Sequence, residues 1–568
     1  MSEYLHGAYG EIDAEGNPQA IESQNAMVIF GTAPVHLIRG GANNVNKPIV
    51  IRNIAEARRV FGYSDDWASY SLCMAFKHFF DRKAVGPLVV VNVLDPDVHQ
   101  KESEVSENKT PSEGVITLSD ADKVDISSIV VGTKVLDTDY TVTTDSNTNT
   151  VIITEKTEGA LGTAALTVTY NKNQATSVSK TPSNGKIMLA AAENIILDTL
   201  EIYTTGGSPT KKVEDTDYTV AYNADKKTIT ITSIGNRLGS DALTVSYKEI
   251  DVSAVTDSVF IGTTDGKGLN TGLYTIKNVY GATGMIPAYI LAPGFSNHPD
   301  VHGAMKALSK QINGHWTAWI FADIPILDGA TKIGLDTAKT WKDANGYTAD
   351  NETVYFPMVE GTDGKKYYLS VLAAANFLEL LIDNDDIPYH SASNTACTVI
   401  QNLYLGEDVT GRVYDDEIIN EYLCKNGIAS AAYVAGRWAI WGAHSAEYDQ
   451  TNKDQINVAE TNRMMLAYIC NDFEARRPLM VDQPLSRNDI ESIVAEEQAR
   501  LDALVGIGAL LYAKATLDAE SDNRSDIING DWLFDFEVTT TPLAKSLKAK
   551  VIWVDNGFAV YFGAEEAE

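Results

Sequence analysis

The stretch Ala26-Met27-Val28-Ile29-Phe30-Gly31-Thr32-Ala33 decides how this chain of 568 residues is interpreted. It is a continuous apolar run closed by a glycine, a pattern typical of a buried strand. Further along, residues 53–62 have the spacing of a short helix with an asparagine cap and a glycine stop. Residues 67–80 are also helical in spacing, and residues 87–93 return to strand. Alternating strands and helices predict an α/β layer.

The same alternation resumes near Val255, where the pattern predicts a strand at 289–295, a helix at 300–312 and a strand at 316–323. Two helices are then expected, followed by strands. The expected helices are 458–470 and 486–512, and the expected strands are 532–538, 547–554 and 558–562. Ser486 followed by Asp489 is an acidic variant of a capping box at the start of the second helix. Asp555-Asn556-Gly557 between the last two strands predicts a hairpin turn.

Between these two parts, residues 101–250 differ sharply in composition, because they contain no Phe, Trp, His or Cys. Asp137-Thr138-Asp139-Tyr140-Thr141-Val142 recurs 78 residues later at 215–220, and Ala165 to Tyr170 recurs 77 residues later at 242–247. Each copy alternates apolar and polar residues, as half-buried strands do. The repeat predicts two tandem β-sandwich modules of immunoglobulin-like type, inserted into a different host domain.

Charge and cysteine usage exclude several classes of protein. The formal charge is −32, which argues against nucleic acid and against an anionic membrane surface as partners. No apolar run approaches the ~20 residues that span a bilayer, so direct membrane insertion is not expected. The N-terminus also lacks the pattern of a secretion signal. The four cysteines are widely spaced and indicate neither disulfides nor a zinc site.

An α/β layer raises the question of catalysis, and three residues are candidates for it. Asp323 follows a predicted strand, and His298 and His302 follow another. The chain contains no Gly-x-Ser-x-Gly elbow that would hold an activated serine, so we do not expect an enzyme. His298 and His302 have metal-ligand spacing on a helix, but Pro299 between them favours a helix cap or a loop.

Two further motifs suggest a ligand but are better explained as turns. Residues 262–272 are glycine-rich and contain Gly266-Lys267-Gly268, yet they lack the spacing of a phosphate-binding loop. The repeated Asp-Thr-Asp-Tyr offers carboxylates for calcium, but its position before a strand in both modules favours a turn. We therefore expect neither metal nor cofactor.

The last third of the chain contains motifs in a specific order. Asn426-Gly427-Ile428 is followed by Gly436-Arg437-Trp438-Ala439-Ile440-Trp441-Gly442-Ala443, and then by Asn457 to Met465. Leu533 to Thr539 precedes the step Pro542-Leu543-Ala544-Lys545. These motifs resemble those of contractile-tail sheath proteins, which occur in phage tails, R-type bacteriocins and related injection systems. The chain departs from the family at His444, where Arg or Thr is usual, and in having a single basic residue in its version of the "NVRR" helix start.

The resemblance covers roughly residues 1–95 and 255–568, and it implies an architecture. The α/β layer would be subtilisin-like without catalysis, and an inner α+β domain would face a tail tube. The expected divisions are a linking arm at 1–25, host residues 26–100, the insert at 101–250, a subtilisin-like part at 251–440 and a tube-facing part at 441–568. The family implies hexameric rings stacked in a helical tube, with tail tube, baseplate and tail terminator proteins as partners. It also implies a place in the virion tail after assembly in the host cytoplasm.

The two ends of the chain are the expected joints between subunits. Backbone pairing between an arm and a hairpin joins chains by adding strands to an open sheet edge. The arm residues are Ala8, Tyr9, Gly10, Glu11 and Ile12, and the hairpin residues are Lys548, Lys550, Val551, Ile552, Trp553, Val554, Val560 and Tyr561. The alternative is that the hairpin completes a sheet within its own chain.

A different class of protein, a surface or virion adhesin built on immunoglobulin-like modules, also fits part of the sequence. It accounts for residues 101–250 but leaves the large α/β host unexplained. The two hypotheses differ in whether the purified protein forms long tubes.

Overall fold

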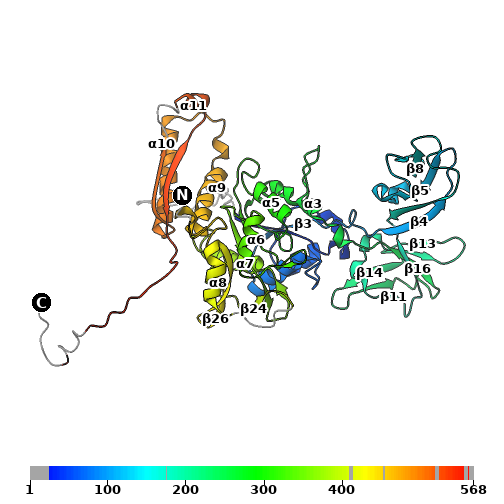
Figure 1. Ribbon diagram of the computed structural model, residues 1–568, viewed down its shortest axis with the longest axis horizontal. Coiled ribbons are helices and arrows are strands. Elements are labelled where there is room, and N and C mark those ends of the chain that lie inside the picture. The colour runs from blue at the N-terminus through cyan, green and yellow to red at the C-terminus, as the bar shows by residue number, and fades with distance from the viewer. Residues whose placement is uncertain are drawn as a thin grey trace, which may run out of the picture. The chain divides into compact units, whose positions relative to one another are not determined.

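The computed structural model describes residues 25–173, 175–407, 414–451, 455–517, 524–554 and 561. The chain forms two compact units, residues 1–479 and 480–568. The first unit contains most of the helices and sheets, including the inserted repeat (Figure 1). The predicted mixture of α/β structure with several sheets is confirmed.

The core of the first unit is an eight-stranded sheet. In spatial order its strands are β2 (Ile49–Ile51), β3 (Leu88–Asn92), β1 (Asn25–Gly31), β17 (Ile286–Leu291), β18 (Trp319–Asp323), β21 (Glu352–Tyr355), β25 (Ile428–Val434) and β26 (Arg437–Trp441). All pairs are parallel except those at the two edges, β2 with β3 and β25 with β26. Every residue of β3, β17, β18 and β21 is buried, so both faces of the sheet are covered.

The helices around this sheet follow local signals in the sequence. They are α1 (Ile54–Phe61), α2 (Ser71–Phe76), α3 (Asp257–Ile261), α4 (Val279–Thr283), α5 (Pro299–Leu308), α6 (Ala338–Ala344), α7 (Leu369–Asp383), α8 (Asp416–Tyr422) and α9 (Glu460–Arg476). The Asn53 side chain accepts a bond from the Glu56 N–H at 2.9 Å, which confirms the expected cap of α1. Helix α2 continues as one π-helical segment, η3 (Lys77–Lys83). Two small sheets, β23 (Lys366–Tyr367), β22 (Met358–Gly361) and β24 (Ile400–Tyr404), and β19 (Leu327–Asp328) with β20 (Thr331–Lys332), complete the body.

Two helices of the structure are shorter than the sequence predicted. The helix expected at 300–312 is α5, which ends at Leu308, and the chain then turns through residues with positive φ at Gln311 and Asn313. The helix expected at 486–512 is α10 (Arg487–Gly506). Gly508, with φ of +82°, adopts the left-handed conformation that ends this helix, and β27 (Leu510–Leu517) begins immediately afterwards.

The inserted repeat forms two modules with the same plan, module 1 (101–173) and module 2 (175–250). Module 1 has the sheets β4 (Ser103–Lys109), β9 (Leu166–Lys172), β6 (Val130–Val131) and β5 (Val115–Ser119), β8 (Thr150–Glu155), β7 (Tyr140–Asp145). Module 2 has β10 (Thr176–Lys180), β16 (Leu243–Tyr247), β12 (Glu201–Thr204), β13 (Lys211–Lys212) and β11 (Lys186–Leu189), β15 (Thr228–Ser233), β14 (Tyr218–Asn223). All pairs are antiparallel, and each module encloses its own apolar core between its two sheets.

The insert enters and leaves the α/β body at one place. Gln100 and Ile250 form an antiparallel bridge, and the Lys101 N–H donates to the Glu249 carbonyl oxygen at 2.7 Å. The Asp251 N–H donates to the His99 carbonyl oxygen at 2.9 Å. The two ends of the insert are therefore held side by side as a short two-stranded ladder.

The second unit contains α10, β27, α11 (Arg524–Asn529) and β28 (Phe534–Thr540). The Ser486 side chain accepts from the Asp489 N–H, and the Asp489 carboxylate accepts from the Ser486 N–H at 2.7 Å, so the predicted capping box is confirmed. β27 and β28 pair antiparallel. The strand expected at 547–554 is not formed, because residues 541–554 have neither helix nor strand in the single chain. The rest of that hairpin, except Tyr561, lies outside the described residues.

Candidate functional site

Of the three candidate catalytic residues, Asp323 and His302 are buried in the interior of the α/β body, whereas His298 is partly exposed. The Asp323 carboxylate, at the end of β18, accepts bonds from the Ser370 N–H at 3.1 Å and from the Ser370 hydroxyl. Burial raises the pKa of Asp323 to about 7. Because Ser370 is in the first turn of α7, this carboxylate fastens the start of that helix to the sheet.

The two histidines have other partners. His302 Nε2 lies 2.6 Å from Glu352 Oε2, and its ring stacks on Tyr347 at a centroid distance of 3.6 Å. His298 precedes α5 as its N-cap residue, and its Nδ1 lies 2.7 Å from Asp257 Oδ1. Among the contacts of the described residues, none joins either histidine to Asp323. Asp323, Ser370, His302 and Glu352 are all buried, and they form two separate hydrogen-bonded pairs in the packed interior.

The residues described here do not bring together three His, Cys, Asp or Glu side chains that could hold a metal ion. The glycine-rich segment 262–272 folds around its own carboxylate. The N–H groups of Lys267 and Leu269 both donate to Asp265 Oδ1 at 2.8 Å. A bound phosphate would need these N–H groups as donors, but Asp265 already occupies them. The geometry therefore agrees with the predicted turn.

The repeated Asp-Thr-Asp-Tyr is also a turn. The second aspartate of each copy, Asp139 and Asp217, accepts the N–H of the residue four positions earlier at 2.8 Å. The first aspartate of each copy, Asp137 and Asp215, has a φ of 60°. The following tyrosine begins β7 or β14 and is buried in the module core. The carboxylates of Asp139 and Asp217 thus bind backbone N–H groups, which confirms the turn at the start of a strand.

The motifs near the end of the first unit have clear structural roles. Gly427 has a φ of +66°, and a Cβ at this position would lie 2.8 Å from the carbonyl oxygens of Ser445 and Tyr448. Only glycine fits there. The buried Glu460 begins α9 and accepts bonds from the hydroxyls of Thr353 and Ser391, each at 2.6 Å, and burial raises its pKa.

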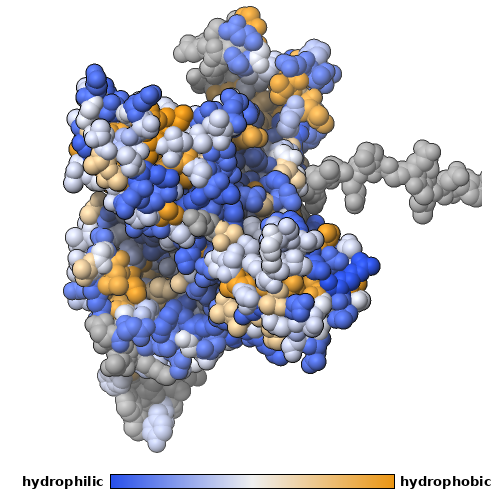
Figure 2. Space-filling view, turned by 90° about the vertical axis from the view of Figure 1, so that its right-hand side faces the viewer, coloured by the Kyte–Doolittle hydropathy of each residue, from blue (hydrophilic) through white to orange (hydrophobic). Residues whose placement is uncertain are grey.

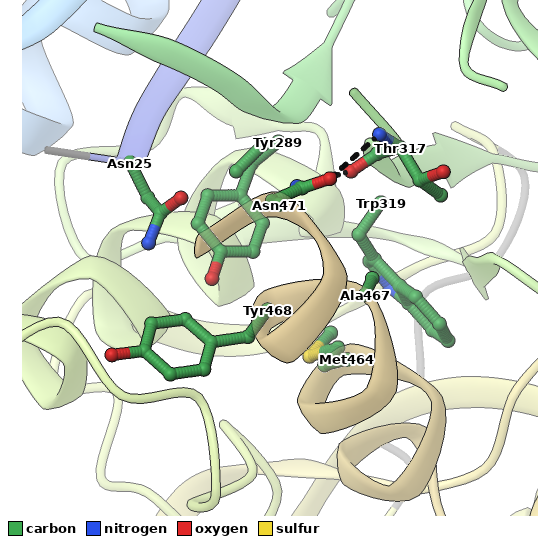
Figure 3. Close-up of a pocket in the computed structure, with 9 residues that line it drawn as sticks. Asn25, Tyr289, Thr317, Trp319, Met464, Ala467, Tyr468 and Asn471 are labelled. Atoms are coloured by element: carbon green, nitrogen blue, oxygen red, sulfur yellow. Dashed lines mark hydrogen bonds between the residues drawn. The ribbon is translucent and has the colours of Figure 1, made fainter. Parts of the chain in front are cut away.

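Helix α9 is also fastened near its other end. The Asn471 side chain accepts from the Thr317 N–H and donates to the Thr317 carbonyl oxygen, both at 2.9 Å (Figure 3). Beside this contact, Tyr289, Trp319, Met464 and Tyr468 line a hollow of about 10 Å³. A space of that size holds about one water molecule, so it is a packing defect and not a ligand site.

The proposed joints are exposed wherever the structure describes them. Val551 is 93% exposed and Trp553 is 78% exposed, and Leu547, Ile552, Val554 and Tyr561 are exposed as well. Lys548 and Lys550 are also exposed. Ala8, Tyr9, Gly10, Glu11, Ile12 and Val560 lie outside the described residues. Figure 1 shows residues 541–554, which follow β28, as an extended segment. Several large apolar side chains in one exposed segment are unusual in a subunit that acts alone.

The sheet of the second unit has two strands, β27 and β28. Within residues 480–517 and 524–554 no further strand adds to either outer edge. Leu511 and Tyr512 of β27 are exposed, as is Leu533 just before β28. A two-stranded sheet is marginal in water unless a helix or further strands support it, and α10 packs against β27 here.

None of the described helices is both long and apolar enough to cross a membrane.

Comparison with known proteins confirms the resemblance to contractile-tail sheath proteins. The chain is 24% identical over 555 residues to a protein of Burkholderia phage BcepMu named tail sheath protein, covering 95% of this chain and 94% of that one. No protein-family model matches the chain.

Two solved structures that are similar to the chain are described as sheath proteins. The sheath tail protein of Desulfitobacterium hafniense is 11% identical, with 94% of this chain and 100% of that chain covered and a TM-score of 0.41. The sheath complex of an extracellular contractile injection system in its contracted state is 13% identical, with 51% of this chain and 77% of that chain covered and a TM-score of 0.40.

Proposed function

We propose that this protein is the structural subunit of a contractile tail sheath, without enzymatic activity. The observation that carries the proposal is the similarity to a phage tail sheath protein along 95% of the chain. In this function the subunits stack as hexameric rings around a tail tube, and contraction drives the tube through the target envelope. The partners are further copies of the chain, the tube protein, and baseplate and terminator proteins.

The domain organisation predicted from the sequence remains part of this proposal. Residues 26–100 supply β1, β2 and β3, and residues 251–440 supply most of the strands beside them in the same sheet. This arrangement supports one α/β domain, subtilisin-like and non-catalytic, that is interrupted by the insert. The two antiparallel sheets of each module support the immunoglobulin-like description. Residues 1–25 form the linking arm, and residues 441–568 form the tube-facing part.

The joints between subunits are the arm around Ala8 to Ile12 and the segment 547–562. The exposed apolar side chains of residues 547–554 support a role in contacts between chains. Each backbone hydrogen bond contributes about 0.5–1.5 kcal/mol net, so a pairing of some six residues is worth several kcal/mol. Repeated around a ring, such joints keep subunits connected while their bodies rotate.

The alternative function, an adhesin, is less well supported. An adhesin would use the inserted modules, whereas the similarity to the tail sheath protein extends over 95% of the chain and so includes the α/β body. No described feature of the body favours it.

Negative-stain electron microscopy of the purified protein tests the proposed function, with light scattering across a wide concentration range. We expect helical tubes without nucleotide or metal. A strictly monomeric protein at high concentration, with no tubes after long incubation, would contradict it.

A further inference from the structure

The N-terminal arm enters the α/β body through Asn25, where β1 is held less regularly than along the rest of its length. Asn25 pairs with Ile286 of β17, but the register shifts before the next pair, Met27 with Tyr289. Pairing with β3 starts only at Val28. The first residue of β1 therefore has a ladder partner on one side only, and an irregularity separates it from the regular ladder.

A side chain from another element holds this first residue. The Asn25 N–H donates to Asp386 Oδ2 at 2.8 Å. Asp386 follows α7, and its own N–H donates to the Leu381 carbonyl oxygen at 2.8 Å, so the carboxylate is fixed to the end of that helix. Asp385 and Asp386 have φ values of 52° and 65°, a left-handed conformation that costs free energy at residues other than glycine. The turn thus keeps a strained backbone while it presents the carboxylate to Asn25.

The carboxylate of Asp386 has little compensation for its burial. Some carboxylates that join distant segments of this unit are paired with a cation. Arg39, for example, docks module 2 on the body by donating to Glu214 at 2.6 Å, and it lies 3.6 Å from Asp198. Burial raises the pKa of Asp386 to about 6, and among the described residues only hydrogen bonds from Asn25 oppose this rise. A half-buried carboxylate kept at this cost indicates a role toward Asn25.

The root of the arm also lies against elements that are themselves firmly held. Asn25, Tyr289 of β17 and Tyr468 of α9 line the same small hollow (Figure 3). Helix α9 is fastened to the body near both of its ends. From Val28 onward, β1 is paired on both sides, with β3 and with β17. The bond to Asp386 therefore joins the arm to a well-packed part of the body.

We propose that Asp386 is a positioning residue for the linking arm, which keeps Asn25 in line with β1 so that a pull on the arm loads β1 along its length. A strand pulled along its axis must break its ladder bonds together, whereas a strand that is free at its first residue is peeled one bond at a time. Figure 2 shows apolar side chains of the described residues as small groups on a largely polar face, so that face offers no broad apolar contact to share the load. The inference rests on the proposed function, in which the arm joins neighbouring copies.

Pulling single molecules of the full chain at constant force tests this role. Handles are attached at the N-terminus and, through an azide side chain, at Leu327, an exposed residue of the body, so that the load passes through β1. Asp386→Gly removes the carboxylate and suits the positive φ, and Asp385→Gly is the matched control at the neighbouring position. We expect the lifetime of the body under load to fall about tenfold in Asp386→Gly, because a hydrogen bond to a charged group is lost, and to change little in Asp385→Gly.

Two further variants address the same bond. Asn25→Pro removes the donor instead of the acceptor, at the first residue of a strand, where proline is tolerated. It should shorten the lifetime as much as Asp386→Gly does. Asp386→Asn keeps an acceptor oxygen and should restore most of the wild-type lifetime. A protein that is merely destabilised by any change at position 386 would show no such rescue.

Hydrogen exchange and electron microscopy of the same variants separate the outcomes. Exchange at residues 25–27 should be about tenfold faster in Asp386→Gly. An unchanged lifetime in both Asp386→Gly and Asn25→Pro overturns the inference, even if exchange is faster. An equal loss of lifetime in Asp385→Gly overturns it as well. Wild-type protein that forms no tubes counts against the sheath function, whereas the lifetimes decide the role of Asp386 in either case.

Discussion

His36 makes the docking of module 2 sensitive to acid. This residue lies in η1 (Val35–Leu37) and is buried between the body and module 2. Its Nε2 lies 2.7 Å from the Glu193 carbonyl oxygen, so Nε2 donates and Nδ1 carries no proton. Nδ1 is buried without a partner, and burial lowers the pKa of His36 from 6.5 to about 4. A second proton would place a charge where no group can accept its hydrogen bond.

The free energy of docking that is lost on acidification follows from the pKa of His36. The exposed imidazole takes up a proton below pH 6.5, whereas the docked one does so only near pH 4. Docking is therefore at full strength above pH 6.5 and is progressively lost as the pH falls to about 4. At pH 5 the undocked state gains roughly 2 kcal/mol, about thirtyfold in population, and the limiting loss is about 3 kcal/mol.

Hydrogen exchange measured by mass spectrometry at pH 7 and pH 5, corrected for intrinsic exchange rates, tests this prediction. We expect peptides covering residues 34–41 and 192–200 to exchange about thirtyfold faster at pH 5. The matched control is His36→Gln, which keeps a donor for the Glu193 carbonyl oxygen but does not titrate. Its exchange at these peptides should be nearly independent of pH. The same pH dependence in both proteins would refute the reasoning.

Three other predictions follow from the same structure. Replacing residues 101–250 with a short Gly/Ser linker should leave a folded body that still forms tubes in electron micrographs, because the flanking residues His99 and Asp251 are hydrogen-bonded to each other and a short linker can close the gap; a body that folds but no longer assembles would show the insert to be architectural. Truncation after Leu543 should leave a subunit with an unchanged melting curve that no longer polymerises in sedimentation, and normal tubes from it would exclude the C-terminal joint. Asp323→Asn should abolish a fall of roughly 3 kcal/mol in the free energy of unfolding between pH 4 and pH 7, because the folded protein resists ionisation of Asp323 up to a pKa of about 7; urea titrations in which the free energy of unfolding changes equally over this pH range in both proteins would contradict this.

Strong local signals predicted much of this fold. The apolar run at residues 26–33 predicted β1 (Asn25–Gly31) correctly. The signal was clear because a strand that is covered on both faces can be apolar at every position. The caps at Asn53 and Ser486 are confirmed because each needs only one side chain and a neighbouring backbone N–H. The repeated Asp-Thr-Asp-Tyr indicated its turn for the same reason.

Long-range contacts were not predictable in this way. Residues 510–512 are apolar and suit either helix or strand, and pairing with β28 decides between them. The strand expected at 547–554 has β-type alternation but no partner strand among the residues that the structure describes. The docking of module 2 depends on Arg39, which is more than 150 residues distant from its partners, and nothing in its neighbourhood signals that contact. The arm around Ala8 to Ile12 stays a prediction.

The short two-stranded ladder that joins the insert to the α/β body affects how the chain folds during synthesis. β1 lies between β3 and β17, yet β17 is made roughly 250 residues after β1, which takes about 10–50 s on the ribosome. Both modules emerge in that interval, and their largely local strand pairings allow them to fold early. Once folded, the modules bring His99 and Asp251 together, and these two residues share a backbone hydrogen bond. The chain that must close to bring β17 beside β1 is then effectively about 150 residues shorter, which lowers the entropy lost in closure. The insert thus acts as a scaffold for nascent-chain folding of the sheet that it interrupts.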